Sequence, residues 1–212
     1  MNLVAPLEAP VDGRAARWEQ HNVDRRRALV EDAVRAIREL GPGVGMDEIA
    51  ARAKTSKTVL YRHFGDKSGL YRAVVESVEQ YILRKLPLDD AELVEPHELV
   101  TQLADAYLAV VERDRNLYLF VASRPTGEVP TEDPVLTITT HIGNAVAEAM
   151  RAWLAREGLD EDPANIWAHG VTGFIWAVAD RWIVTNLRRP RAEVVAYIDS
   201  FFAPAFAAQQ RS

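Results

Sequence analysis

Between Ser56 and Lys67 the chain places hydroxyl, aromatic and basic side chains at helical spacing. Ser56 is a good helix N-cap, and the apolar residues Leu60 and Phe64 that follow it share one face with Val59. The opposite face presents a mixed polar and basic set: Lys57, Thr58, Tyr61, Arg62 and His63. Side chains of these types suit the phosphates and base edges of a DNA major groove.

A second apolar stripe lies just before this segment. Met46, Ile49, Ala50 and Ala53 follow helical spacing, and only a tight turn separates them from Ser56. The two segments together predict a helix-turn-helix, with residues 56–64 as the recognition helix. The alternative is a pair of short helices in an all-α protein that does not bind DNA, whose basic face is only solvated.

The charge distribution favours a DNA contact. Residues 25–72 hold eleven Lys or Arg and six Asp or Glu, a balance of +5 in a chain whose formal net charge is −6. The rest of the chain therefore sums to −11. A basic segment in an acidic protein is the electrostatic pattern expected of a local contact with a polyanion, and the acidic remainder would be repelled by that polyanion.

Residues 25–72 resemble the DNA-binding domain of TetR-type bacterial regulators, which are similar to the tetracycline repressor. The resemblance is carried by a first helix over residues 27–40, by the Gly-Pro-Gly break after it, and by Asp-Glu-Ile-Ala at 47–50. Its most specific part is the run Leu-Tyr-x-His-Phe-x-x-Lys-x-x-Leu at 60–70. The length of the chain also fits this family, at one such domain plus roughly 140 further residues.

The resemblance implies roles for individual residues. It implies that Ser56 and Lys57 lie near phosphates, and that Lys67 contacts a phosphate together with the N-terminal amides of the next helix. The implied DNA-binding set is Ser56, Lys57, Thr58, Tyr61, Arg62, His63 and Lys67. Three of these residues have simpler alternatives: Tyr61 as a packing aromatic, His63 as a helix residue without a base contact, and Lys67 as a surface residue at a helix start.

Three positions depart from the family pattern. The turn position that usually holds glycine is Lys54, so either Lys54 takes a left-handed conformation at some cost or the turn differs. Thr58 stands where a smaller residue is common. Gly45 replaces a threonine that often caps the second helix, so a hydroxyl–phosphate contact is expected to be absent. These departures affect the operator sequence rather than the fold.

Composition limits the remaining possibilities. The chain has 212 residues, 48% of them apolar, which is enough for a substantial core. No segment approaches the roughly 20 apolar residues of a membrane span. Residues 1–24 lack the apolar core of a signal peptide and are expected to form a flexible arm. The absence of cysteine excludes disulfides and cysteine-ligated metals and fits a cytoplasmic protein.

Helical spacing dominates the rest of the sequence, which predicts an all-α protein of about nine helices. The predicted domains are the arm, a helix-turn-helix domain over residues 25–72, and a helical effector-binding and dimerisation domain over 73–212. The helix predicted at 67–86 belongs to both folded domains, so it could transmit a movement of one domain to the other, as a lever does. Beyond it, helices are expected at 97–113, 116–123, 134–157, 163–187 and 190–207. Loops are predicted at residues 87–96 and 124–133. Asp162–Pro163 is predicted to start a helix, with proline at the first helical position. Pro204 is expected to kink the last helix or fray its end.

The last two predicted helices are apolar on more sides than one domain core requires. Gly170, Gly173 and Ala177 would allow close helix approach. We therefore expect helices 163–187 and 190–207 to form a four-helix bundle with a second copy, which agrees with the dimers of TetR-like regulators. Such a dimer would place two recognition helices about 34 Å apart on a palindromic operator. The alternative is a buried helix pair in a monomer.

Inward aromatic and apolar residues of the middle helices predict a pocket for a hydrophobic small molecule, such as an acyl chain, a lipid or a lipophilic drug. The predicted lining residues are Tyr107, Tyr118, Phe120, Ile142, Trp153, Trp167, Phe174 and Trp176. Aromatic residues at helical spacing are also typical of ordinary core.

The expected function is a ligand-responsive regulator, with a repressor leaving its operator when ligand stabilises one pose of the fourth helix. An effector-independent architectural factor is the first alternative. An enzyme is the second and much less favoured alternative, because the sequence contains no phosphate loop, nucleophile elbow or metal-binding pair. No cofactor and no metal site are expected.

Overall fold

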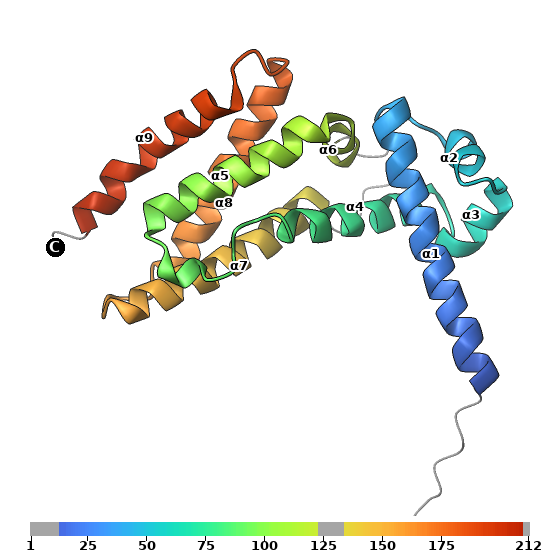
Figure 1. Ribbon diagram of the computed structural model, residues 1–212, viewed down its shortest axis with the longest axis horizontal. Coiled ribbons are helices and arrows are strands. Elements are labelled where there is room, and N and C mark those ends of the chain that lie inside the picture. Colours follow the sequence, from blue (N-terminus) through green and yellow to red (C-terminus); the bar gives the residue numbers. More distant parts are fainter. Residues whose placement is uncertain (1–12, 123–133, 210–212) are drawn as a thin grey trace, which may run out of the picture.

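The computed structural model describes residues 13–122 and 134–209, and within these residues every regular element is a helix. These two ranges contain nine α-helices and one 3₁₀ helix, which confirms the predicted all-α fold of about nine helices. Figure 1 shows α1, α2 and α3 gathered at one end of the molecule, with α4 leading from them into the remaining helices.

The helix bounds agree with the predicted segments to within a few residues, except at α1. They are α1 Gly13–Leu40, α2 Met46–Arg52, α3 Lys57–Phe64, α4 Lys67–Leu83, η1 Ala91–Leu93, α5 Pro96–Arg113, α6 Arg115–Ala122, α7 Pro134–Arg156, α8 Ala164–Val184 and α9 Arg191–Gln209.

The first helix corrects the sequence-based prediction. It begins at Gly13 instead of near residue 27, so residues 13–24, predicted as part of a flexible arm, are helical. The apolar stripe that predicted the helix begins only at Leu29. Upstream of it the chain is polar but contains no proline after position 10, so nothing in the sequence interrupts the helix. The first twelve residues of the predicted arm lie outside the described residues.

Three smaller boundaries also differ. Pro163 is the residue before α8 rather than its first helical residue, a shift of one position. α9 contains Pro204, as predicted, and continues to Gln209, two residues beyond the predicted end. The predicted loop at 87–96 contains the one-turn helix η1. The predicted loop at 124–133 lies outside the described residues.

The three N-terminal helices pack around a small core of their own. Leu29, Ala33 and Ile37 of α1 are fully buried, as is Leu60 of α3. Ile49 of α2 completes the contact at 3% exposure. Because these residues occupy one stripe on each helix, the opposite faces remain in solvent.

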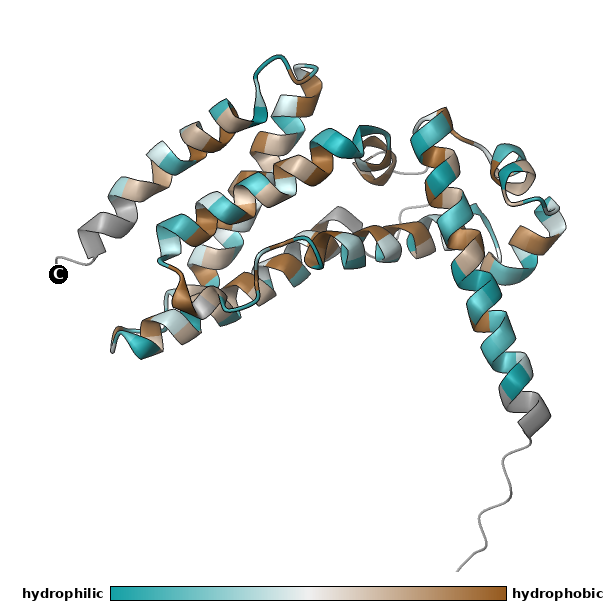
Figure 2. Ribbon diagram, viewed as in Figure 1, coloured by the Kyte–Doolittle hydropathy of each residue, from teal (hydrophilic) through white to brown (hydrophobic). Residues whose placement is uncertain are grey.

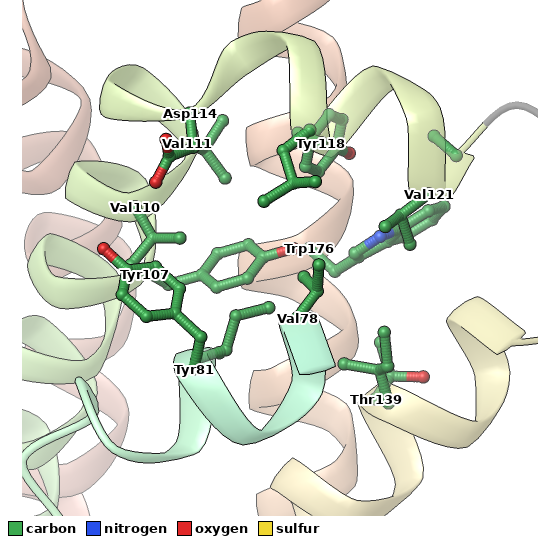
Figure 3. Close-up of a pocket in the computed structure, with 14 residues that line it drawn as sticks. Val78, Tyr81, Tyr107, Val110, Val111, Asp114, Tyr118, Val121, Thr139 and Trp176 are labelled. Atoms are coloured by element: carbon green, nitrogen blue, oxygen red, sulfur yellow. The ribbon is translucent and has the colours of Figure 1, made fainter. Parts of the chain in front are cut away.

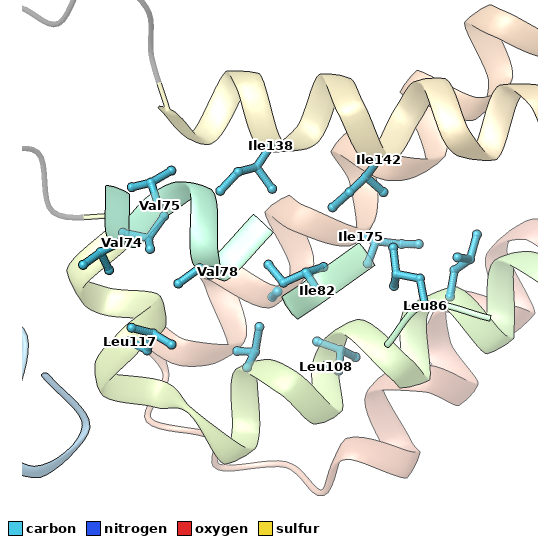
Figure 4. Packing of buried hydrophobic residues seen from close by; sticks show 14 of the residues in the cluster. Val74, Val75, Val78, Ile82, Leu86, Leu108, Leu117, Ile138, Ile142 and Ile175 are labelled. Atoms are coloured by element: carbon cyan, nitrogen blue, oxygen red, sulfur yellow. The ribbon is translucent and has the colours of Figure 1, made fainter. Parts of the chain in front are cut away.

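The fourth helix forms part of the core of the larger helical unit. Figure 4 shows Val74, Val75, Val78 and Ile82 of α4 facing apolar side chains from α5, α6 and α7. Figure 2 shows the same division, with hydrophilic residues along much of α1 and hydrophobic stretches where α4, α5 and α7 meet. α4 therefore begins next to the end of α3 and packs against α5, α6 and α7 along most of its length.

The helices of the larger unit pack mainly in two pairs, α7 with α8 and α5 with α9. A Cβ at Gly143 of α7 would lie 2.7 Å from the ring of His169 on α8, so a larger residue at this position would force the histidine ring to move. Within the described residues, no helix is long and apolar enough to cross a membrane.

Candidate nucleic-acid interface and ligand pocket

The turn between α2 and α3 is formed by a left-handed residue and an N-cap. Lys54 has φ +49°, and the backbone N–H groups of Lys54 and Thr55 donate to the carbonyls of Ala51 and Ala50. Ser56 then caps α3, its side-chain oxygen accepting from the N–H of Val59 at 3.3 Å. Of the two alternatives left by the sequence, the structure shows the strained one: Lys54 takes the conformation usually reserved for glycine.

The face of α3 that points away from the protein is polar and accessible. Leu60 and Phe64 are buried, whereas Lys57, Thr58 and Arg62 are exposed. Tyr61 is 43% exposed, so more than half of its surface is covered while the rest is accessible to a partner. A short helix that buries only two side chains leaves most of its surface for a partner.

Lys57 already has an anionic neighbour. Its Nζ lies 2.9 Å from the carboxylate of Asp47 on α2, and both side chains are exposed. The hydrogen bond and charge of Asp47 raise the pKa of Lys57 above its usual value. Because an exposed ion pair is weak, a phosphate could take the place of Asp47 at this ammonium group.

His63 lies at the boundary between α3 and α1. Partial burial lowers its pKa, and the positive charges of Arg62, Arg25 and Arg26 lower it further. The imidazole is therefore neutral at pH 7 and can act as a hydrogen-bonding group rather than as a cation. The guanidinium of Arg26 lies 4.8 Å from the centre of the Phe64 ring, which ties α1 to the end of α3.

The start of α4 is a capped N-terminus beside the recognition helix. Asp66 is its N-cap and accepts a hydrogen bond from the N–H of Gly69 at 2.6 Å, while Lys67 is exposed at the first helical position. A Cβ at Gly69 would lie 1.9 Å from the carbonyl oxygen of Phe64, so this close approach of α4 to the end of α3 requires glycine.

Gly45 occupies the N-cap of α2, where it offers no hydroxyl. The carboxylate of Glu48 accepts from its N–H at 2.5 Å, so the start of this helix is stabilised from one side only.

An apolar cavity with two lobes lies among α4, α5, α6, α7 and α8. The space between the lining side chains, together with the solvent at its openings, is about 540 Å³ in the first lobe and about 390 Å³ in the second. Four residues line both: Tyr107, Ile138, Thr139 and Trp176. Figure 3 shows side chains of several helices converging on the first lobe. A mostly apolar lining with a few polar groups is typical of small-molecule sites.

The polar groups near the cavity are few. The hydroxyl of Tyr118 donates to Asp180 at 3.3 Å. Burial raises the pKa of both Tyr107 and Tyr118 well above the usual value, and the Asp180 carboxylate raises both further. Both phenols therefore keep their protons and can orient a polar group on a ligand.

The eight residues predicted to line the pocket fall into two groups. Tyr107, Tyr118, Ile142 and Trp176 line the cavity. The other four are not among the residues that line its two lobes. Phe120 packs against the Tyr71 ring at 5.4 Å, and Phe174 joins Phe201 and Phe202 in an aromatic cluster between α8 and α9. Trp153 and Trp167 pack in the core of α7 and α8.

The sequence reasoning missed the contribution of α4 to the cavity. Val78, Tyr81 and Ile82 line the first lobe, and Asp114 lines it from the end of α5. The signal that could have found them is the apolar stripe of the fourth helix, which was interpreted only as a lever. Asp114 is 8% exposed, and no local pattern distinguishes it from a surface aspartate.

Asp114 connects the cavity with the N-terminal helices. The Nε and Nη2 atoms of Arg38 on α1 donate to its two carboxylate oxygens at 2.7 and 3.0 Å. The side chain of Asn116 also donates to the backbone carbonyl of Arg38 at 2.9 Å. A bidentate pair with one partner buried fixes the end of α1 on the α5–α6 junction.

The outer surface of α8 and α9 is unusually apolar. Ile166, Val184, Tyr197 and Phe201 are each more than half exposed. Between Ile166 and Val184, the exposed side of α8 carries Gly170 and Ala177. Exposed apolar side chains that continue along two neighbouring helices are typical of a protein contact.

No group of His, Asp or Glu among the described residues could hold a metal ion.

Comparison with known proteins agrees with this geometry. The family model of bacterial regulatory proteins of the tetR family matches residues 29–74. An uncharacterized HTH-type transcriptional regulator of Mycobacterium tuberculosis is 31% identical over 199 residues, which cover 92% of this chain and 82% of that protein. The HTH-type transcriptional activator FasR of Mycolicibacterium smegmatis is 27% identical over 147 residues, 69% of this chain and 65% of that protein.

Solved structures share the fold at lower identity. The regulator FadR of Bacillus subtilis in complex with stearoyl-CoA has a TM-score of 0.66 and 15% identity, covering 82% of this chain and 95% of that one. AibR, in complex with isovaleryl coenzyme A and operator DNA, has a TM-score of 0.58 and 19% identity, covering 84% and 97%. With its matched N-terminal segment, its all-helical fold and a relative aligned over most of both lengths, the chain belongs to the TetR family of transcriptional regulators.

Proposed function

We propose that this TetR-family protein is a homodimeric repressor that leaves a palindromic operator when an acyl effector enters the two-lobed cavity. The observation that carries the proposal is the place of α4: it begins beside the recognition helix and lines the cavity with Val78, Tyr81 and Ile82. A ligand that fits the cavity better in one pose of α4 changes the position of α3, and it shifts the population toward that pose.

The proposed DNA contacts come from α3 and the start of α4. Exposed Lys57, Thr58, Tyr61 and Arg62 would meet phosphates and base edges, together with Ser56 and the neutral His63. Lys67 would meet a phosphate beside the N-terminal amides of α4. Such a protein acts where the chromosome is, which is the cytoplasm in bacteria.

The contacts are tested by Tyr61→Ala and Lys67→Ala. Either variant should weaken operator binding about tenfold with little change in Tm, because both side chains are exposed. Lys67→Ala should also reduce the salt dependence of binding by about one counterion. Arg156→Ala on α7 is a matched control. Unchanged affinity in a variant would remove that residue from the interface.

The proposed dimer interface is the apolar surface of α8 and α9, with Ile166 and Phe201 at its exposed positions. Two copies joined there would form a four-helix bundle around a twofold axis. Each protomer would contact only a few base pairs through its recognition helix. Because the two protomers are related by a twofold axis, the dimer would bind a palindromic operator.

The proposed effector class is an acyl chain, carried as its coenzyme A thioester. The cavity is apolar and has two lobes in succession, which suits an elongated chain better than a compact polar metabolite. Two proteins of the same fold have been solved with acyl-CoA molecules, a long-chain and a short branched one. Those ligands support the class without fixing the length of the chain.

The direct test measures binding of a fluorescent operator duplex, taken from a selection on random DNA, with and without dodecanoyl-CoA. We expect the thioester to raise Tm and to weaken operator binding at least tenfold, which corresponds to about 1.4 kcal/mol of coupling. If straight-chain thioesters of four to eighteen carbons change neither quantity, the protein fits the effector-independent alternative and the proposal fails.

The direction of regulation has its own test, because one relative is named an activator. In a reporter fusion to a promoter that carries the operator, deletion of the gene should raise expression if the protein represses. Loss of expression on deletion would instead assign activation, with the same DNA interface and cavity.

A further inference from the structure

A polar cleft opens beside the first lobe of the cavity, between α1 and α4. Together with the solvent at its opening it measures about 680 Å³. Its lining residues are Glu31, Val34, Arg35 and Arg38 of α1, Ser77, Val78 and Tyr81 of α4 with the C-cap Arg84, and Leu117 of α6. Val78, Tyr81 and Leu117 also line the first lobe of the apolar cavity. A polar cleft and an apolar cavity therefore share one wall, which is the arrangement that an amphiphilic molecule requires.

The cationic side chains of the cleft differ in how firmly they are held. Among the described residues, Arg35 pairs with Asp32 and Glu31 of its own helix, at 3.2 and 3.8 Å; Arg35 and Glu31 are exposed and Asp32 is partly buried. Arg84 makes no ion pair within the described residues. Exposed pairs contribute little, so Arg35 and Arg84 can turn to an incoming anion at small cost.

Arg38 is held differently, because its pair with the nearly buried Asp114 is bidentate. That pair stands where the cleft meets the cavity, since Arg38 lines the first and Asp114 lines the second. Arg38 and Lys85 are each 6.0 Å from the centre of the Tyr81 ring. The Arg38 guanidinium is thus fixed and its charge is offset by Asp114, while Arg35 and Arg84 remain adjustable.

We propose that the α1–α4 cleft binds the phosphate-bearing head of the effector through Arg35 and Arg84 while its acyl chain occupies the cavity behind Tyr81. This inference rests on the proposed acyl effector and adds a second, anionic subsite to it. Arg35 belongs to the DNA-binding helices and Arg84 to the end of α4. A head group bound by both would link the two units directly.

The test compares dodecanoyl-CoA with dodecanoate by calorimetry, both below their micellar concentrations, on the full chain and on Arg35→Ala/Arg84→Ala. We expect the wild type to bind the thioester at least tenfold more tightly than the free acid. The double variant should lose that advantage and keep its affinity for dodecanoate, since the cavity is untouched. Arg151→Ala, which removes an exposed arginine of α7, is the matched control and should change neither affinity.

The possible results separate the two proposals. Equal wild-type affinity for thioester and acid, or a double variant that keeps the preference, would overturn the head-group subsite and leave the acyl effector standing. Failure of both ligands to bind the wild type would overturn the effector proposal and the subsite together. The Tm of the double variant shows that it is folded, and Arg35→Lys/Arg84→Lys should retain part of the preference because the charges remain.

Discussion

At the scale of single residues, the recognition surface combines accessible groups with two that are constrained by their neighbours. Tyr61 and Arg62 are free to meet a partner, whereas Lys57 is paired with Asp47 and His63 is kept neutral by burial and three arginines. The residue types could be read from the sequence. Their pairing could not, because Asp47 and Lys57 belong to different helices.

Removing the carboxylate of Asp47 should strengthen DNA binding. Asp47→Asn frees Lys57 and removes a negative charge close to the phosphates, so we expect affinity to rise about two- to fivefold at low salt. Fluorescence anisotropy on the operator duplex measures this. Glu148→Gln, a matched change on α7, should have no effect. A lower affinity for Asp47→Asn would mean that the ion pair orients Lys57 for contact.

Lys54 holds a left-handed conformation that is costly for any residue with a Cβ. Lys54→Gly should therefore stabilise the protein by about 1 kcal/mol, a rise in Tm of about 2–4 °C. Thermal unfolding measures the change, and Lys54→Ala is the control that removes the charge without relieving the strain. A gain of equal size in both variants would show that charge, not backbone strain, is the cause.

At the scale of elements, α4 has the largest influence because it touches both units. Its first turn is fitted against the end of α3 through Gly69, and its middle packs among α5, α6 and α7. The hydroxyl of Tyr71 donates to the backbone of Val121 at 2.7 Å, which adds a polar link to α6. In the proposed switch, a displacement of α4 would move α3 with it, because of this close contact.

Adding one methyl group at Gly69 should disrupt this junction. A Cβ there would lie 1.9 Å from the Phe64 carbonyl oxygen, so Gly69→Ala should cost about 3 kcal/mol and abolish operator binding. Chemical denaturation monitored by circular dichroism measures the loss. Gly43→Ala is the control, because a Cβ at that position meets nothing within 4 Å. Equal stability of the two variants would contradict the close α3–α4 fit.

Most of the helices could be predicted from apolar spacing and from proline or glycine at their ends, as the agreement for α2 to α9 shows. The N-terminal half of α1 could not, because residues 17–28 bury no side chain and so show no apolar stripe. Only half of the predicted lining residues lie in the cavity, because apolar spacing does not show what a side chain packs against. Spacing identifies inward aromatics such as Tyr107 and Phe174, but only packing decides which of them face a cavity and which face another helix.

At the scale of the whole molecule, the two proposed contact surfaces are both exposed: the α3 face at one end and the apolar side of α8 and α9. Between them lie the cavity and the Arg38–Asp114 pair. In the proposed dimer, the distance between the two α3 helices depends on the contacts from the α8–α9 surface through the cavity and the Arg38–Asp114 pair to α3. A ligand bound far from the DNA can therefore alter operator binding.

The dimer surface can be tested without damage to the protomer. A Cβ at Gly173 on α8 meets nothing within 4 Å, so Gly173→Glu should fold normally and still place a charge in the proposed interface. Light scattering should report a dimer for the wild type and a monomer for the variant, with operator affinity reduced at least a hundredfold. Ala155→Glu on the exposed side of α7 is the control. A variant that remains dimeric would exclude this face.

The most direct measurement for the central claim is selection of bound duplexes from random DNA by the purified protein at low ionic strength. The proposal predicts enrichment of one palindrome with half-sites about one helical turn apart, and loss of that enrichment with Tyr61→Ala. Recovery of no preferred sequence, or of a motif without twofold symmetry, would contradict a dimer that reads DNA with α3.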